Sequence, residues 1–306
     1  MLVFVGKRIL ELLPVLFGVL LVTFAVTRFT PGDPAILMAG EDANQALIEA
    51  TRVRLGLDQP IPTQFGLYVI RAVQGDLGVS YVRSVPVTEL IGRALVPTAQ
   101  LAGIAMIITV VVGIPLGIVS AVRPDSIWDF AARIVSLIGV SIPNFFFGLL
   151  LILLFSLALG WLPSYGTGTW RHLILPALTL GTFSVGLVAR LTRASMLDVL
   201  SQDYVRTARA KGLRGVTVVY KHGLRNAAIA IVTILGLNLG SLLSGSVLTE
   251  VVFAYPGLGR LLVDAIFNRD YAIVQGAILV IAVIYVLVNL GVDLLYASVD
   301  PRIRVE

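Results

Sequence analysis

The side chains that most often carry chemistry in proteins are sparse in this chain. It has no cysteine, and neither of its two histidines, His172 and His222, has a second ligand at the spacing of a metal site. The sequence contains neither the phosphate-binding pattern Gly-x4-Gly-Lys-Ser/Thr nor a Ser/His/Asp or dicarboxylate constellation. We therefore predict that the chain is not an enzyme, with no catalytic residue, no metal site and no cofactor of its own.

Polar residues inside apolar stretches indicate a second kind of chemistry, the passage of a polar substrate. Asn238, Ser241 and Gly245 share one side of an apolar helix predicted over residues 228–248, and they are candidates for lining a pathway. A separate series of small residues at every fourth position would let another helix approach closely. This series consists of Gly236, Gly240 and Ser244.

The stretch Pro143-Asn144-Phe145-Phe146-Phe147 combines a proline with an aromatic cluster. Proline removes a backbone donor and bends a helix, so a kink or a hydrophobic gate at Asn144 and Phe145 is one interpretation. Packing in a core or against lipid is the alternative. Asn144 and Phe145 are therefore further pathway candidates.

Residues 203–212 combine helix-forming residues with cations. Asp203 could cap a helix, Tyr204 to Lys211 would continue it, and Gly212 would end it in a left-handed conformation. Tyr204, Ala208 and Lys211 then fall along one side. Such a cation-rich helix could rest on lipid headgroups or serve as a docking knob for another protein.

These candidates must be positioned by membrane-spanning helices. Of the 306 residues, 57% are hydrophobic and 13% charged, whereas a soluble domain has about 25% charged residues. We predict a single all-α polytopic membrane domain over residues 1–306, with about six crossings of ~20 residues each. The predicted spans are Ile9–Thr27, Pro97–Val119, Ile134–Leu159, Leu173–Ala189, Ala228–Leu248 and Ile273–Tyr296.

The distribution of cations predicts the orientation of these spans. Eight lysines and arginines lie in residues 190–227, which we predict to be cytoplasmic, as are both termini. The same rule explains the net charge of +5 without nucleic acid, so we predict membrane lipid rather than nucleic acid as a partner. Residues 28–93 form a long extracytoplasmic segment with a helix predicted over residues 44–55, either a cap that docks a delivery protein or a solvated connector.

Several blocks along the chain resemble one family of transport proteins. Arg206-Thr207-Ala208, then Gly212, then His222-Gly223-Leu224 match the spacing of the "EAA" loop of ABC-importer permeases. The other blocks resemble the dipeptide/oligopeptide/nickel branch of binding-protein-dependent permeases, of the first-permease type. They are Pro31-Gly32-Asp33-Pro34, Leu55-Gly56-Leu57-Asp58-Gln59-Pro60, Gly75-Asp76-Leu77-Gly78, Phe253-Ala254-Tyr255-Pro256-Gly257-Leu258-Gly259, Arg269-Asp270-Tyr271 and Asp300-Pro301-Arg302.

This resemblance implies a type I ABC importer permease of the prokaryotic cytoplasmic membrane. It implies a homologous second permease, two cytoplasmic ATPase subunits that bind ATP and Mg, and an extracytoplasmic substrate-binding protein. Peptides are the implied substrates, with nickel complexes, glutathione or oligosaccharide as alternatives. The residues implied in ATPase coupling are Asp203, Tyr204, Arg206, Thr207, Ala208, Arg209, Lys211, Gly212 and His222.

Other classes of membrane protein fit the sequence less well. A secondary transporter would show ionisable coupling residues deep in its spans, or two repeated halves, and neither is evident. A structural or receptor subunit is disfavoured by the resemblance alone.

Overall fold

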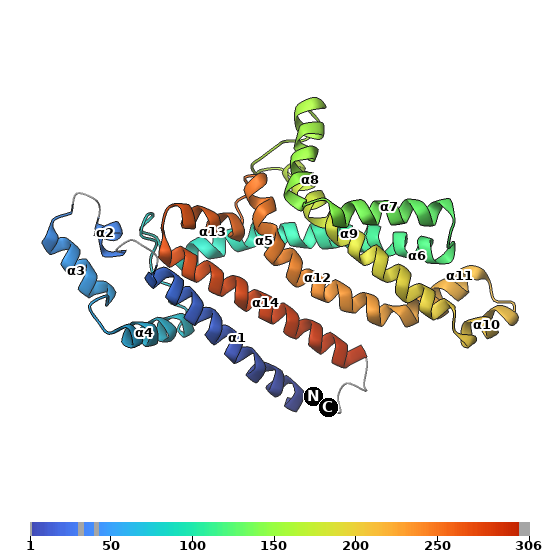
Figure 1. Ribbon diagram of the computed structural model, residues 1–306, viewed down its shortest axis with the longest axis horizontal. Helices are drawn as coiled ribbons and strands as arrows, with labels where there is room; N and C mark the ends of the chain where they lie inside the picture. Colours follow the sequence, from blue (N-terminus) through green and yellow to red (C-terminus); the bar gives the residue numbers. More distant parts are fainter. Residues whose placement is uncertain (1, 30–33, 40–42, 300–306) are drawn as a thin grey trace. The chain divides into compact units, whose positions relative to one another are not determined.

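The computed structural model describes residues 2–29, 34–39 and 43–299, and over these residues its regular structure is helical (Figure 1). The blocks Pro31-Gly32-Asp33 and Asp300-Pro301-Arg302 lie outside the described residues. The helices are α1 (Leu2–Phe29), α2 (Pro34–Ala39), α3 (Gln45–Leu55), α4 (Ile61–Val73), α5 (Val87–Ile108), α6 (Ile114–Val122), α7 (Ile127–Ser141), α8 (Asn144–Leu151), α9 (Arg171–Leu200), α10 (Asp203–Ala210), α11 (Gly215–Thr217), α12 (Arg225–Val252), α13 (Leu258–Phe267) and α14 (Tyr271–Val299). π-Helical stretches continue some of them: η1 (Thr109–Gly113), η2 (Ile152–Ala158) and η3 (Val218–Leu224).

Five helical stretches among the described residues are long and apolar enough to cross a membrane. They are Leu10–Phe29, Val87–Val122, Arg171–Leu200, Gly215–Leu243 and Tyr271–Leu294. A sixth crossing results if α7 and the α8–η2 helix count as one bent span. The predicted all-α polytopic fold with about six spans is therefore confirmed.

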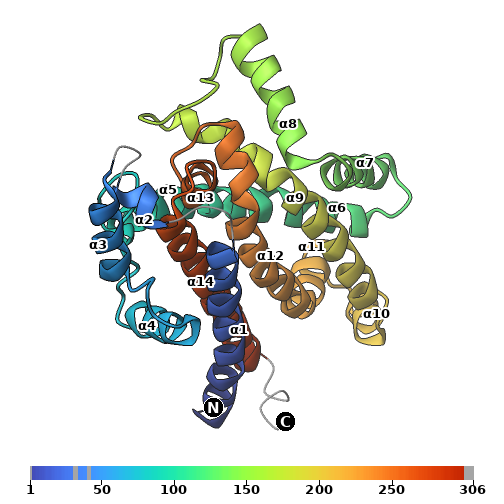
Figure 2. The same ribbon diagram turned by 60° about the vertical axis from the view of Figure 1, so that its left-hand side comes forward.

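The third predicted span differs from the structure in its shape. Residues 134–159 were expected to form one helix, but the helix direction bends by 106° between α7 and α8 (Figure 2). Ile142 at the corner is extended, with φ −88° and ψ 126°. The cause is Pro143, which has no N–H to donate and disfavours helical backbone in the residue before it. The kink interpretation of Pro143 is thus correct, and the continuous helix is wrong.

The chain divides into two compact units, which we describe separately. The α9 unit comprises residues 98–255 and 287–299, and α9 is its central helix, with Leu175, Leu180 and Met196 buried. Glycines bring α7 close to α9: a Cβ on Gly139 would lie 2.7 Å from the Thr182 carbonyl oxygen. The crossing of these two helices therefore requires a residue without a side chain.

The α13 unit comprises residues 2–97 and 256–286. Its apolar core joins the first turns of α5 to α13 and the start of α14, through residues such as Val87, Leu258 and Ala277. Asp270 is 1% exposed and holds the turn between α4 and α5, accepting hydrogen bonds from the Ser80 hydroxyl at 2.5 Å and the Tyr81 N–H at 3.3 Å. The block Arg269-Asp270-Tyr271 thus has a structural role.

The segment after α1 is folded into helices. The predicted helix over residues 44–55 is confirmed as α3, with the Asn44 side chain accepting a hydrogen bond from the Leu47 N–H at 2.9 Å and Gly56 in the left-handed region at φ 70°. The next helix, α4, lies against α1. Its Phe65 ring meets Phe17 and Phe24 edge-on, at centroid distances of 5.7 and 5.3 Å.

Candidate functional site

The predicted coupling helix is present as α10, at the far end of α9 (Figure 1). Its inner side carries Val205, fully buried, and Ala208, 5% exposed, which pack against Val218 and Leu200. Tyr204 is 43% exposed on the outer side. The helix is therefore seated on its own chain by small apolar contacts, and its charged side faces outward.

The two ends of α10 differ in how well the sequence predicts them. Gly212 has φ 76°, and its N–H donates to the Arg209 carbonyl at 2.9 Å, so the predicted left-handed stop is present. The prediction that Asp203 caps the start is wrong. Gln202 holds the cap position without a side-chain bond, and Asp203 is the first helical residue. Its carboxylate lies 3.2 Å from Arg206, an exposed pair that still suits the positive end of the helix.

The other predicted coupling residues lie around the same helix. The Thr207 hydroxyl donates to the Asp203 carbonyl at 3.0 Å, and Arg209 and Lys211 are exposed. His222 belongs to η3, and its carbonyl accepts a hydrogen bond from the Asn226 side chain at 2.7 Å. The loop predicted over residues 190–227 is thus mostly helical, because α9 runs on to Leu200 instead of ending near Ala189.

A buried ion pair, which sequence patterns did not single out, joins α7 to α9. Asp129 of α7 is fully buried, and Arg193 of α9 donates to both of its oxygens, at 2.9 and 3.0 Å. Arg133 lies 3.2 Å from the same carboxylate, and the Ser120 hydroxyl donates to it. Arg193 is seven residues before the end of α9 at Leu200, so this cluster ties the helix that leads to α10 to α6 and α7.

The predicted pathway residues of α12 do not all face the same way. Asn238 is 3% exposed, and its side-chain oxygen accepts a hydrogen bond from the Ser184 hydroxyl of α9 at 3.0 Å. Its amide nitrogen is buried with no hydrogen-bond partner among the described atoms. Ser241 is exposed. Gly245 lies within α12, but its surroundings fall outside the described residues.

The small-residue series of α12 has a packing role at Gly236. A Cβ there would lie 2.5 Å from Cγ2 of Val292 in α14, so the two helices approach as closely as the series suggests.

The remaining candidates, Asn144 and Phe145, begin α8 immediately after the corner at Pro143. Asn144 is half-buried and Phe145 is 43% exposed. Helices α8 and α12 pack on each other, but among the described residues the side-chain hydrogen bond observed for Asn238 is to Ser184 and not to Asn144. They remain predictions for the pathway.

A third buried carboxylate, after Asp270 and Asp129, lies near the end of α12. Glu250 is fully buried and accepts a hydrogen bond from the Thr98 hydroxyl at 2.6 Å. Burial, and then the charge of Glu250, raise the pKa of nearby Tyr255 above its ordinary value. Across the described ranges, no group of three or more His, Asp or Glu side chains could hold a metal ion.

Comparisons with known proteins agree over nearly the whole chain. A family model described as "Binding-protein-dependent transport system inner membrane component" matches residues 113–305. Its companion, "Binding-prot-dependent transport system membrane comp, N-term", matches residues 1–102. Together the two models cover α10, the segment between α1 and α5 and the spans, except for residues 103–112 within the second span.

Individual relatives extend this similarity. The glutathione transport system permease protein GsiC of Escherichia coli is 49% identical over 304 residues, covering 99% of both chains. The protein of the same name from Pectobacterium atrosepticum is 48% identical over 298 residues and 97% of both chains. A solved structure of the MetNI methionine ABC transporter has a TM-score of 0.59 at 23% identity, covering 69% of this chain and 96% of that chain. An amino acid ABC transporter has a TM-score of 0.56 at 17% identity, covering 69% of this chain and 94% of that chain.

Proposed function

The chain belongs to the family of inner-membrane components of binding-protein-dependent transport systems, the permeases of ABC importers, and from this premise we propose that it forms one half of the import pathway for a small peptide, with glutathione as the first candidate. Its fold is that of a type I ABC importer permease, and it is a multi-pass inner-membrane protein. The observation that carries the substrate proposal is the 49% identity to a glutathione permease over 99% of both chains.

We propose that the chain works with a second permease, two ATPases that bind ATP and Mg, and an extracytoplasmic binding protein. The exposed side of α10 supplies the contact with an ATPase. Its seat on Val218 and Leu200 supports this role, because a helix packed on its own chain transmits a rigid-body movement that a loose loop would absorb. Residues 28–93 dock the binding protein, and both termini lie in the cytoplasm.

Uptake into proteoliposomes tests the proposal. The chain, its sister permease and the ATPases are reconstituted with the cognate binding protein, and labelled glutathione is offered with and without enclosed ATP. We expect uptake that needs ATP and stops with a disabled ATPase. Competition by dipeptides, longer peptides, nickel complexes and oligosaccharides then ranks the substrate classes. Uptake without ATP would overturn the importer assignment, whereas ATP-driven uptake of another class would replace glutathione.

A further inference from the structure

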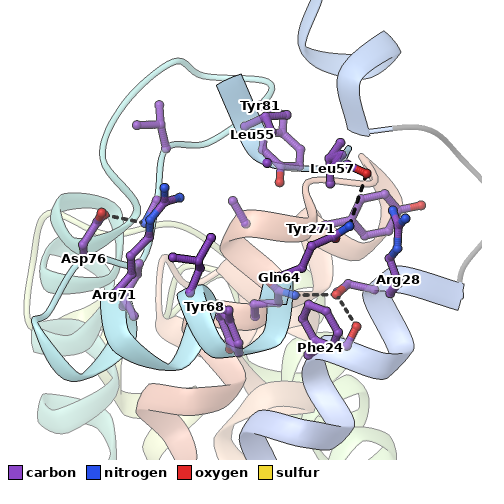
Figure 3. A pocket seen from close by; sticks show the side chains of 18 of the residues that line it. Phe24, Arg28, Leu55, Leu57, Gln64, Tyr68, Arg71, Asp76, Tyr81 and Tyr271 are labelled. Atoms are coloured by element: carbon purple, nitrogen blue, oxygen red, sulfur yellow. Dashed lines mark hydrogen bonds between the residues drawn. The ribbon is translucent and has the colours of Figure 1, made fainter. Parts of the chain in front are cut away.

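The α13 unit contains a cavity of about 560 Å³ at the end of α1 where the apolar span stops (Figure 3). Its wall is formed by the last turns of α1 and α3, one side of α4 from Gln64 to Arg71, the turn after α4 and the start of α14. Arg28, Arg54 and Arg71 line it together with one carboxylate, Asp76, so the lining is net positive. Figure 3 shows Arg28 and Arg71 on opposite sides of the space, with Asp76 beside Arg71.

The position of each arginine, taken singly, is explained by the helix in which it lies. Arg28 and Arg71 lie in the last turns of α1 and α4, and Arg54 in the last turn of α3, where a cation complements the helix dipole. That effect accounts for each residue but does not require the three helix ends to meet at one hollow. Their convergence makes a site for an anion.

The depth of the neighbouring helix indicates which anion. Phe65 of α4 touches Phe17 and Phe24, which lie about 18 and 7.5 Å along α1 from its end at Phe29, at 1.5 Å per residue. Tyr68 stacks on Phe24 at 6.0 Å and its hydroxyl lies 3.4 Å from the Thr23 hydroxyl. Helix α4 therefore packs beside the apolar span of α1 itself, not beyond its end.

The free face of α4 suits that depth. The helix has one charged residue, Arg71, among its thirteen. Ile70 is 55% and Val73 81% exposed. Leu67 both lines the cavity and is 41% exposed, so it belongs to the cavity wall and to the exposed apolar face of α4.

We propose that the cavity binds the phosphate headgroup of an anionic phospholipid, whose acyl chains lie along Leu67, Ile70 and Val73 of α4. In the orientation proposed above, this lipid belongs to the outer leaflet. Tyr68, Tyr81 and Tyr271 in the lining are the residues typical of the boundary between hydrocarbon and water. A free peptide or phosphate would match the positive charge of the lining but would leave the apolar face uncovered.

Lipid retention on the purified full-length chain tests this site. The protein is equilibrated in mixed micelles with equal phosphatidylglycerol and phosphatidylcholine, exchanged into lipid-free detergent, and weighed by native mass spectrometry. We expect the wild type to retain phosphatidylglycerol preferentially, and the double variant Arg28→Gln/Arg71→Gln to lose at least about tenfold of that preference. The control variant Arg52→Gln/Arg83→Gln removes two charges from the same unit but outside the cavity, and it should keep the preference for phosphatidylglycerol.

Three outcomes overturn the proposal. No headgroup preference in the wild type would do so without any variant, even if the double variant fails to fold. Equal loss in the control variant would indicate a general charge effect. Displacement of the lipid by millimolar glutathione or inorganic phosphate would assign the cavity to a soluble anion. The proposal does not rest on the transported substrate, so failed glutathione uptake leaves it standing.

Discussion

Asp129 is bound by Arg133 and Ser120, four and nine positions away, but its bidentate partner is remote in the sequence, and patterns along the chain do not reveal such a partner. Its bidentate partner Arg193 lies 64 positions away, and the Thr98–Glu250 pair spans 152 positions. A sequence reveals an ionisable residue beside an apolar stretch, which is costly unless it is paired, but it does not reveal the partner. The α10 residues were predictable because their partners are local.

Removing the Asp129 charge should destabilise the protein strongly. Asp129→Asn leaves the Arg193 charge facing an uncharged group in a largely buried place. Breaking a buried pair costs several kcal/mol, and we expect about 3 kcal/mol here, at the low end, because 26% of the Arg193 side chain remains exposed to solvent. Thermal unfolding in detergent should show a clear drop in Tm. The control Asp203→Asn breaks an exposed pair and should change stability by less than about 0.5 kcal/mol. Similar Tm values for the two variants would contradict the structural role of Asp129.

The phenol of Tyr81 should lose its proton at a higher pH than an ordinary tyrosine. Burial, and then the negative charge of Asp270, raise its pKa from 10 to about 12. Below pH 10 the phenol is protonated in both the folded and the unfolded state. Between about pH 10 and 12 only the folded state keeps the proton, so Tyr81 makes the free energy of unfolding fall as pH rises.

Ultraviolet absorbance at alkaline pH measures this titration. Tyr81→Phe should remove a component that titrates near pH 12. Tyr165→Phe, at a tyrosine that is 72% exposed, should leave that component in place. If Tyr81→Phe instead removes a component that titrates near pH 10, Tyr81 is not buried against Asp270 in solution.

At the scale of elements, apolar length and turn chemistry predicted most of the helices. The helix predicted over residues 44–55 is α3, which the Asn44 cap and Gly56 delimit in the structure, and Gly212 predicted the end of α10 because it acts on its immediate neighbours. The continuous third span was wrong although Pro143 carried the signal for a bend. Proline predicts that a helix is interrupted, but the angle depends on how the two arms pack.

The structure refines which residues of α10 should be substituted to test coupling. Ala208 is buried against Val218, so a large charged residue there would unseat the helix itself. Tyr204→Ala and Arg206→Glu change exposed positions and should reduce ATPase co-purification and ATP-driven uptake several-fold while the chain still inserts. Arg133→Gln, in the Asp129 cluster, serves as a control. It changes a charged pair away from α10, so it tests whether lower stability alone reduces ATPase co-purification. Unchanged uptake in both α10 variants would remove α10 from the coupling contact.

At the scale of the whole molecule, sequence predicted the membrane fold but left the substrate open. The predicted pathway residues Asn238 and Ser241 lie on one chain, whereas the passage proposed for this family forms between two permeases. A residue that is buried in this chain alone, such as Asn238, gives no measure of what faces a substrate. The similarity to glutathione permeases supports the proposed substrate class, whereas the geometry of one subunit does not distinguish between substrate classes.

The proposed orientation can be measured with reporters at both ends of the chain. With six crossings and a cytoplasmic N-terminus, green fluorescent protein fused to either end should fluoresce, and alkaline phosphatase fused there should be inactive. Phosphatase fused after Gln59, between α3 and α4, should be active. An active phosphatase at the C-terminus would contradict the orientation.

The corner at residues 142 and 143 also decides on which side of the membrane the chain ends. Helix α7 has 15 residues and α8 with η2 has 8 and 7, so each arm is about 22 Å long, shorter than the ~30 Å of hydrocarbon. Neither arm is long enough to cross alone, so the pair adds one crossing if it is a single bent span and none if it is a re-entrant loop. An even number of crossings returns the chain to the side on which it began, whereas an odd number leaves its two ends on opposite sides.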